Sequence, residues 1–247
     1  EKITQEEYDE AVATPIDDGL LDIDTESTEQ SETAIMLDSY IQEVAAEVEE
    51  AGYDMYSDGL QIYTHLDMDA MTEIYNTIED EDGYYFTNDN MQAAASLVDT
   101  ETGNILALYG GRNQEGQLSY NRATQLERSV GSSIKPFADY ATAIEYLNYS
   151  TESSIEDEEH TYSDGTEINN WDNLYQGTIT LRQALIGSRN IPALKLLQEV
   201  GTEQVDEFLQ GMGIVLNGGN GVYESDAIGG DITPLQLSAA FATLGNY

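Results

Sequence analysis

The stretch Arg128-Ser-Val-Gly-Ser132-Ser-Ile-Lys135-Pro-Phe137 decides how the chain is interpreted. If a helix begins at Ser132, positions i and i+3 share one face, so the Ser132 hydroxyl and the Lys135 amine point the same way. Such a pair offers a nucleophile with a base one turn away. Four-residue patterns of common residues recur by chance, so the rest of the chain has to favour this interpretation over a solvated helix start.

The composition describes a globular and very acidic chain. Its 247 residues are 40% hydrophobic, enough for one large domain or two small ones. It has 48 Asp and Glu against 8 Lys and Arg, a net charge of -40. Such a surface repels nucleic acid and anionic lipid, so neither is expected as a partner. It also repels itself unless salt screens it, which indicates adaptation to high salt or deliberate supercharging.

Several kinds of site are excluded or disfavoured by the sequence. The chain has no cysteine, which excludes disulfide and zinc-thiolate chemistry. It has no run of about 18 apolar residues that would span a membrane. The acidic turn at residues 79–83 lacks the spaced ligands of a calcium loop. We therefore predict no metal site and no cofactor.

Apolar periodicity and turn residues predict a mixed fold of helices and strands. Capping boxes are expected at Thr180 with Gln183 and at Thr233 with Gln236. Asn190 is expected to cap the helix that follows it. Strands are predicted over 60–64, 92–98 and 104–109, the last two as a hairpin, and helices over 35–48, 68–78, 132–147, 181–186, 191–200, 202–210 and 234–244.

The few cations are concentrated in one part of the chain. Seven of the eight lie between residues 112 and 195, although this segment holds only twelve of the 48 acids. Residues 173–198 contain three cations and no acid. One interpretation is that these side chains are buried structural partners. The other is an electropositive floor that binds a carboxylate and lowers the pKa of Lys135.

A second motif, Ser188-Arg-Asn190, falls between two predicted helices, 56 residues beyond Ser132. Alone it would be no more than a helix cap. Together with Ser-x-x-Lys it matters, because serine acyl-transfer sites of the penicillin-recognising type use both elements.

At this point the chain resembles a known family, the transpeptidase domain of class A, high-molecular-weight penicillin-binding proteins. The resemblance is carried by several further stretches, one of which contains the second motif, and they are spread along nearly the whole sequence. The similar stretches are 4–11, 59–67, 92–112, 121–124, 171–172, 177–182, 188–193 and 232–243.

The resemblance implies an α+β fold, the penicillin-binding-protein and serine β-lactamase-like transpeptidase fold with an antiparallel sheet and flanking helices. Residues 1–58 would be a linker after an absent glycosyltransferase domain, and residues 59–247 the N-terminal part of the transpeptidase domain. The family's third motif, Lys-Thr-Gly, does not occur in the sequence. We therefore expect the fold to be incomplete at its C-terminus and the piece alone to be inactive.

The resemblance also assigns the site residues. Ser132 would be the acylated nucleophile and Lys135 its base. Ser188 would relay a proton to the leaving amine, and Asn190 would bond to the substrate or hold Lys135. The substrate-binding residues would be Trp171 and Arg189.

The implied function is a peptidoglycan DD-transpeptidase that cross-links stem peptides and is a target of penicillin. Its substrates and ligands would be D-Ala-D-Ala stem peptides and β-lactams, and its parent would also carry a glycosyltransferase. The expected location is the extracytoplasmic face of the bacterial membrane, through an anchor outside this chain, with cell-wall synthesis or division proteins as partners. The alternatives are a non-catalytic cell-wall binding module and a class D-like serine β-lactamase.

Overall fold

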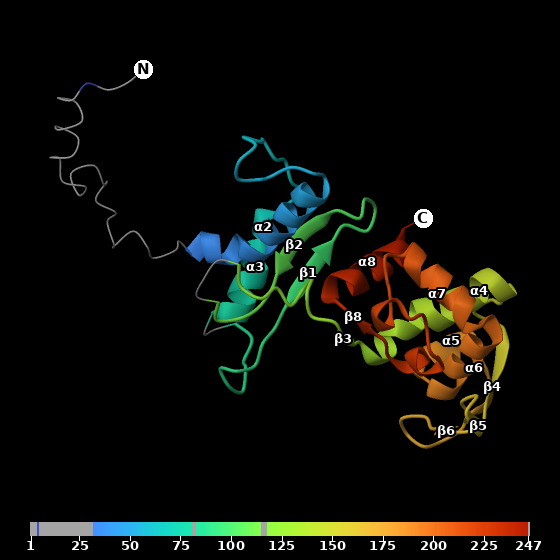
Figure 1. The fold of residues 1–247 in the computed structure, drawn as a ribbon. Coiled ribbons are helices and arrows are strands. Elements are labelled where there is room, and N and C mark those ends of the chain that lie inside the picture. Colours follow the sequence, from blue (N-terminus) through green and yellow to red (C-terminus); the bar gives the residue numbers. More distant parts are fainter. Residues whose placement is uncertain (1–3, 5–31, 81–82, 115–117, 247) are drawn as a thin grey trace.

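The computed structural model describes residues 4, 32–80, 83–114 and 118–246, and the helices and strands fall into two lobes (Figure 1). The first half of the expected linker, residues 5–31, lies outside the described residues. The first lobe contains α2 (Glu32–Glu50), α3 (Met68–Glu79), β1 (Ala95–Val98) and β2 (Ile105–Tyr109).

The first lobe is a β-hairpin covered by two helices. Strands β1 and β2 pair antiparallel, and the Asp99 carboxylate closes the turn by accepting from the backbone N–H of Thr102. Helices α2 and α3 pack on β2 around Met71 and Tyr109, which are buried. The predicted hairpin and both helices are confirmed, with Asp67 as the N-cap of α3.

The predicted strand at residues 60–64 is wrong. The structure gives this segment no regular secondary structure, although its residues alternate as a strand would. Leu60 and Ile62 are 36% and 39% exposed, and they line a groove together with Tyr40 and Val44 of α2. Alternating apolar residues favour a strand, but a strand also needs a hydrogen-bonding neighbour.

The second lobe is mainly helical. Its strands are short and form antiparallel pairs, β3 with β8, β4 with β7 and β5 with β6. The helices are α4 (Thr142–Leu147), α5 (Leu181–Ile186), α6 (Asn190–Val200), α7 (Thr202–Gly211) and α8 (Pro234–Gly245), and the strands β3 (Arg128–Ser129), β4 (Ser154–Asp157), β5 (His160–Thr161), β6 (Glu167–Ile168), β7 (Gly177–Thr180) and β8 (Asp231–Ile232).

Helix α6 is the centre of this lobe. It is apolar on nearly every side, and Leu194, Leu196 and Leu197 are fully buried. It contacts α4, α5 and α7, which explains why its sequence shows little amphipathic contrast. The expected capping boxes at Thr180 and Thr233 are both present.

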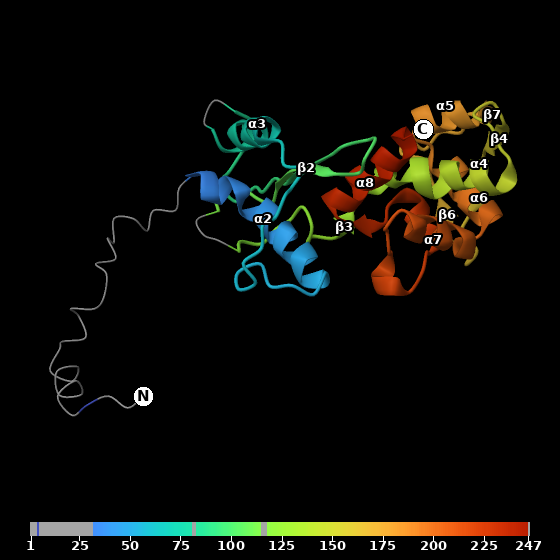
Figure 2. The same cartoon turned by 90° about the horizontal axis from the view of Figure 1, so that it is seen from above.

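Helix α8 lies between the lobes (Figure 2). Its Leu235 packs into the core around Tyr40, whereas Ala240 belongs to the core around α6. The Ser238 hydroxyl lies 2.7 Å from the Ser96 hydroxyl of β1. The result is an α+β fold in which helices flank an antiparallel hairpin, as the sequence predicts.

No helix in the described part of the chain is long and apolar enough to cross a membrane.

Because Leu194 is fully buried in the α6 core, Leu194→Ala should lower the free energy of unfolding by about 2–5 kcal/mol. Urea unfolding at constant high salt measures this. The control is Ile186→Ala on α5, where the side chain is 79% exposed and the change should stay within about 0.5 kcal/mol. Equal losses in the two variants would contradict the placement of α6 at the centre.

Candidate active site

Ser132 and Lys135 lie on a helical segment of changing pitch rather than on the single α-helix that the sequence predicts. Residues Gly131–Ile134 form a 3₁₀ helix, and Pro136–Ala141 form a π-helix that continues into α4. The Lys135 N–H donates to the Ser132 carbonyl. In a 3₁₀ turn, residues i and i+3 are eclipsed, so both side chains lie on one face.

The two residues differ in exposure. Ser132 is exposed, and its hydroxyl makes no hydrogen bond to another described residue. Lys135 is fully buried. The segment therefore presents a free hydroxyl to solvent and keeps an amine beneath it.

The Lys135 amine makes three hydrogen bonds to the second motif. Nζ lies 2.7 Å from Asn190 Oδ1, 2.8 Å from the Ser188 carbonyl and 3.3 Å from Ser188 Oγ. The two motifs, 53 and 55 residues apart at these contacts, thus form one site. Two of these three contacts are short, and the contact to Ser188 Oγ is longer.

Ser188 adopts a left-handed backbone conformation, with φ of 48°. This costs a non-glycine residue roughly 1–2 kcal/mol. The conformation lets the Ser188 carbonyl and hydroxyl both reach Lys135. Strain of this kind often accompanies a functional site.

Asn190 is not the helix cap that the sequence predicts. Its amide oxygen accepts from Lys135, and its Nδ2 donates to the Asn169 carbonyl. The cap comes from Asn170, whose side-chain oxygen accepts from the backbone N–H groups of Asn190 and Ile191. Asn190 is thereby left free to hold Lys135.

Ser188 and Asn190 bond to Lys135, whereas the side chain of Arg189 between them bonds elsewhere and is only 1% exposed. Its guanidinium lies 2.8 Å from both Asp157 and Asp172 and also donates to the Leu174 carbonyl. The guanidinium is buried, and each of its three nitrogens already donates to an acceptor within the protein. These two ion pairs tie the loop that carries Ser188 to Asp157 and Asp172.

Trp171 is 71% exposed, so its side chain is not part of the core. Its indole Nε1–H donates to the Gly187 carbonyl at 3.1 Å. The exposed ring lies beside the loop that carries Ser188. It has an open face for a ligand.

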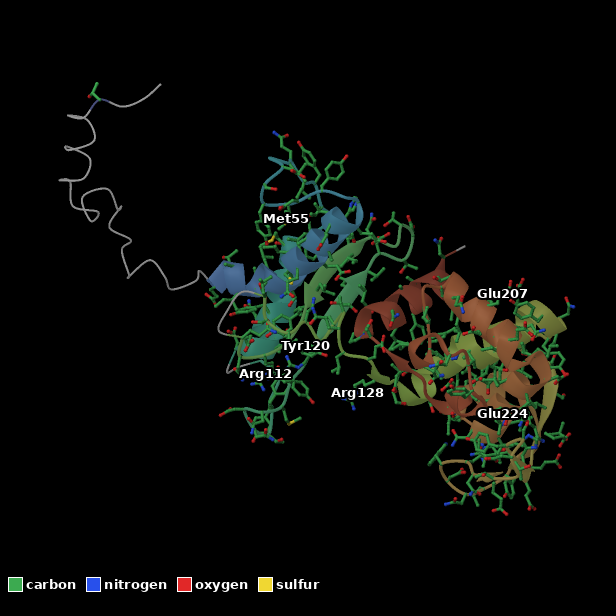
Figure 3. All side chains as sticks on the ribbon, viewed as in Figure 1. Met55, Arg112, Tyr120, Arg128, Glu207 and Glu224 are labelled. Atoms are coloured by element: carbon green, nitrogen blue, oxygen red, sulfur yellow. The ribbon has the colours of Figure 1, made fainter. Side chains whose placement is uncertain are left out.

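The predicted electropositive floor is not present. Figure 3 shows Arg112 on the first lobe, whereas Arg128 belongs to β3. Arg112 stacks on Phe86, and Lys195 pairs with Glu158. Most of these cations are structural partners, which was the other interpretation.

The lowered pKa of Lys135 is nevertheless present. Burial in the second lobe lowers the pKa of Lys135 to about 8, and the Arg189 guanidinium lowers it further, whereas Asp139 acts in the opposite direction. Desolvation is the larger cause, because it disfavours the charged amine.

Asp157 and Asn170 are the residues that sequence reasoning missed. Asp157 is fully buried and accepts from Arg189, from Asn170 Nδ2 at 2.7 Å and from the Gln176 N–H. It lies in the acidic run 156–159, where nothing in the sequence separates it from its exposed neighbours. Asn170 belongs to the polar stretch Asn169-Asn-Trp-Asp172, and this stretch was the only feature of the sequence that could have indicated its role.

The part of the chain that the structure describes contains no group of three or more His, Asp or Glu side chains arranged to hold a metal ion.

Comparison with protein families adds an independent line of support. Residues 93–247 match the family model of the penicillin-binding protein transpeptidase domain. Penicillin-binding protein 1A of Streptococcus pneumoniae is 34% identical over 99% of this chain and 35% of its own length. Penicillin-binding protein 1A/1B of Bacillus subtilis is 40% identical over 84% of this chain and 23% of its own length.

A solved structure agrees with the fold. PonA1 of Mycobacterium tuberculosis in complex with penicillin V superposes with a TM-score of 0.68 at 22% identity, over 83% of this chain and 58% of that chain. The present chain spans about a quarter to a third of the length of the curated relatives described above. Its sequence, its fold and the assembled Ser-x-x-Lys and Ser-x-Asn motifs agree, and the chain belongs to the transpeptidase domain family of class A penicillin-binding proteins.

Proposed function

We propose that this chain forms the nucleophile side of a serine DD-transpeptidase site that cross-links peptidoglycan stem peptides. The observation that carries the proposal is the buried Lys135 amine, bonded to Ser188 and Asn190 and one 3₁₀ turn from the exposed Ser132 hydroxyl. Family membership supports the same chemistry.

The acylation step assigns one role to each residue. Ser132 Oγ attacks the carbonyl between the two D-alanines of a donor stem, and its proton passes to Lys135. The C–N bond then breaks, and the leaving amine takes a proton through the Ser188 hydroxyl. An amine of a second stem attacks the acyl-enzyme, and Ser132 recovers its proton as the new amide forms. The Ser132 backbone N–H would supply one oxyanion donor.

The hydrogen bonds of Lys135 suit a neutral amine. A neutral amine has two hydrogens, which serve the two shorter contacts to the Ser188 carbonyl and Asn190 Oδ1. Its lone pair is then free to accept a proton from the side of the two hydroxyls. Asn190 and the strained Ser188 carbonyl therefore orient the base as well as hold it.

The wider role belongs to the whole protein. β-Lactams are proposed ligands, which the family's penicillin-binding members and the penicillin V complex of PonA1 support. Residues 1–58 are proposed as the linker to a glycosyltransferase domain, and residues 59–247 as part of the transpeptidase domain. We place the site on the extracytoplasmic face of the membrane, with Trp171 beside the bound stem peptide and cell-wall synthesis proteins as partners.

Labelling with a fluorescent penicillin tests the nucleophile. In the intact protein the label should be covalent and stable, and Ser132→Ala should abolish it because no acyl ester can form. The matched control is Ser133→Ala, which changes the adjacent exposed hydroxyl and should keep the labelling.

The other labelling results identify the alternatives. Rapid release of the label from Ser132 would indicate a β-lactamase. A folded protein that never labels would indicate a binding module and would refute the proposed function.

The pH dependence tests the base. Since the pKa of Lys135 is lowered to about 8, the neutral amine is a minority species below that pH. The acylation rate should rise about tenfold per pH unit at lower pH and level off above about pH 8. The rate of penicillin acylation against pH measures this. The control variant Lys195→Met should leave the pH midpoint of acylation unchanged. An acylation rate that does not change between about pH 6 and 9, on either side of the Lys135 pKa, would exclude Lys135 as the base.

A further inference from the structure

Asp139 is a buried acid that the mechanism above does not use. It lies in the π-helix Pro136–Ala141, none of its surface is exposed, and neither carboxylate oxygen has a hydrogen-bond partner among the described residues. Almost all buried polar side chains in proteins have partners, so an unpartnered carboxyl needs an explanation. Single π-helical turns are frequent at functional sites.

The position of Asp139 brings it to Lys135. The π-helix starts directly after Lys135, and Asp139 lies one helical turn further along. Their charges act on each other, because Asp139 favours the ammonium form of Lys135 and Lys135 favours the carboxylate form of Asp139. The adjacent Tyr140 hydroxyl is also buried and without a partner among the described residues.

The other charges near this pair are few. Arg189 acts on Lys135 from the loop before α6, and Asp157 of β4 acts on Tyr140. The remaining charged groups on the elements packed against the π-helix are exposed or bond elsewhere. They are Glu145 on α4, Arg182 on α5, Lys195 and Glu199 on α6, Glu203, Asp206 and Glu207 on α7, and Glu224 and Asp226 on the 3₁₀ helix Glu224–Ile228.

A carboxylate in this place is costly, because it has neither solvent nor donors. Burial accordingly raises the pKa of Asp139 well above its usual range, and Lys135 opposes that effect. When Asp139 is protonated, it carries no negative charge and no longer favours the ammonium form of Lys135. With Asp139 ionised, the ammonium form of Lys135 is favoured and the amine is a poorer base.

We propose that Asp139 is a positioning residue for Lys135, and that the buried carboxyl and the amine form a proton-coupled pair in which the charge of one decides the charge of the other. This rests on the proposed function, since it adds a control to the same base. Below the working pH the pair holds two protons, Asp139-COOH and the ammonium. Loss of one proton gives either the active neutral pair or an inactive ion pair. Asp139 thus sets how much neutral amine is present.

Asp139→Asn tests the coupling, because asparagine has the same shape and stays neutral. The pH midpoint of acylation in the variant should be about one unit lower than in the wild type. One unit is the lower end of the pKa shift that an opposite charge at about 4–6 Å produces. The measurement is penicillin acylation against pH in the intact protein. An unchanged or higher midpoint in a folded variant would overturn the proposal.

The control for a merely structural effect is Asp226→Asn. Asp226 is a second buried acid, but it accepts from Asn217 Nδ2 and the Tyr223 N–H. The loss of this charge should lower the thermal midpoint and leave the pH midpoint of acylation unchanged. A shift equal to that of Asp139→Asn would show that any buried acid produces it and would overturn the proposal.

A spectroscopic titration covers the case in which Asp139→Asn does not fold, and it is independent of acylation. The chain has three lysines, so the Lys135 ζ-nitrogen can be assigned by NMR of ¹⁵N-lysine-labelled protein with Lys195→Arg and Lys2→Arg as references. A coupled pair titrates in two steps at both sites. A single step at Lys135 would refute the coupling. Two steps in a protein that does not label would refute only the proposed function.

Discussion

The buried ion pair between Arg189 and Asp157 is the interaction on which the rest of the site depends. Removing one member of such a pair costs about 3–5 kcal/mol, because the other charge stays buried and uncompensated. Asp157 also holds Asn170, and Asn170 caps α6. The turn between α5 and α6 is thereby fixed, and Ser188 and Asn190 stand on either side of the anchored arginine.

The same constraint explains how an amine remains in the interior of this protein. The Lys135 amine bonds to a carbonyl, a hydroxyl and an amide oxygen rather than to a carboxylate, and burial raises the pKa of Asp139, the carboxyl that acts on it. The large negative charge of the surface therefore has little effect on the pKa of Lys135. The cations that survive in so acidic a chain are mostly those with a structural partner, as Arg189 and Lys195 have.

Local patterns predicted the secondary structure well where the determinants are local. The boxes at Thr180 and Thr233 and the turn at Asp99 each depend on residues within three positions. The predictions failed where a distant partner decided the result. Residues 60–64 alternate as a strand would, but they have no partner strand in the described part of the chain and are exposed. Asn190 is a residue type typical of helix caps, but its side chain bonds to Lys135 and Asn169 instead.

The sequence by itself determined the α+β class and located the two motifs, because spacing within a turn puts Ser132 and Lys135 on one face. Only the tertiary structure decided which charges serve the site. In the folded chain Arg189 is buried and Trp171 is exposed. Asp157 and Asp139 are also buried, which neither composition nor periodicity indicates. Burial and ion pairing depend on segments that meet only after folding. The residues next to a charged group in the sequence therefore do not determine its environment.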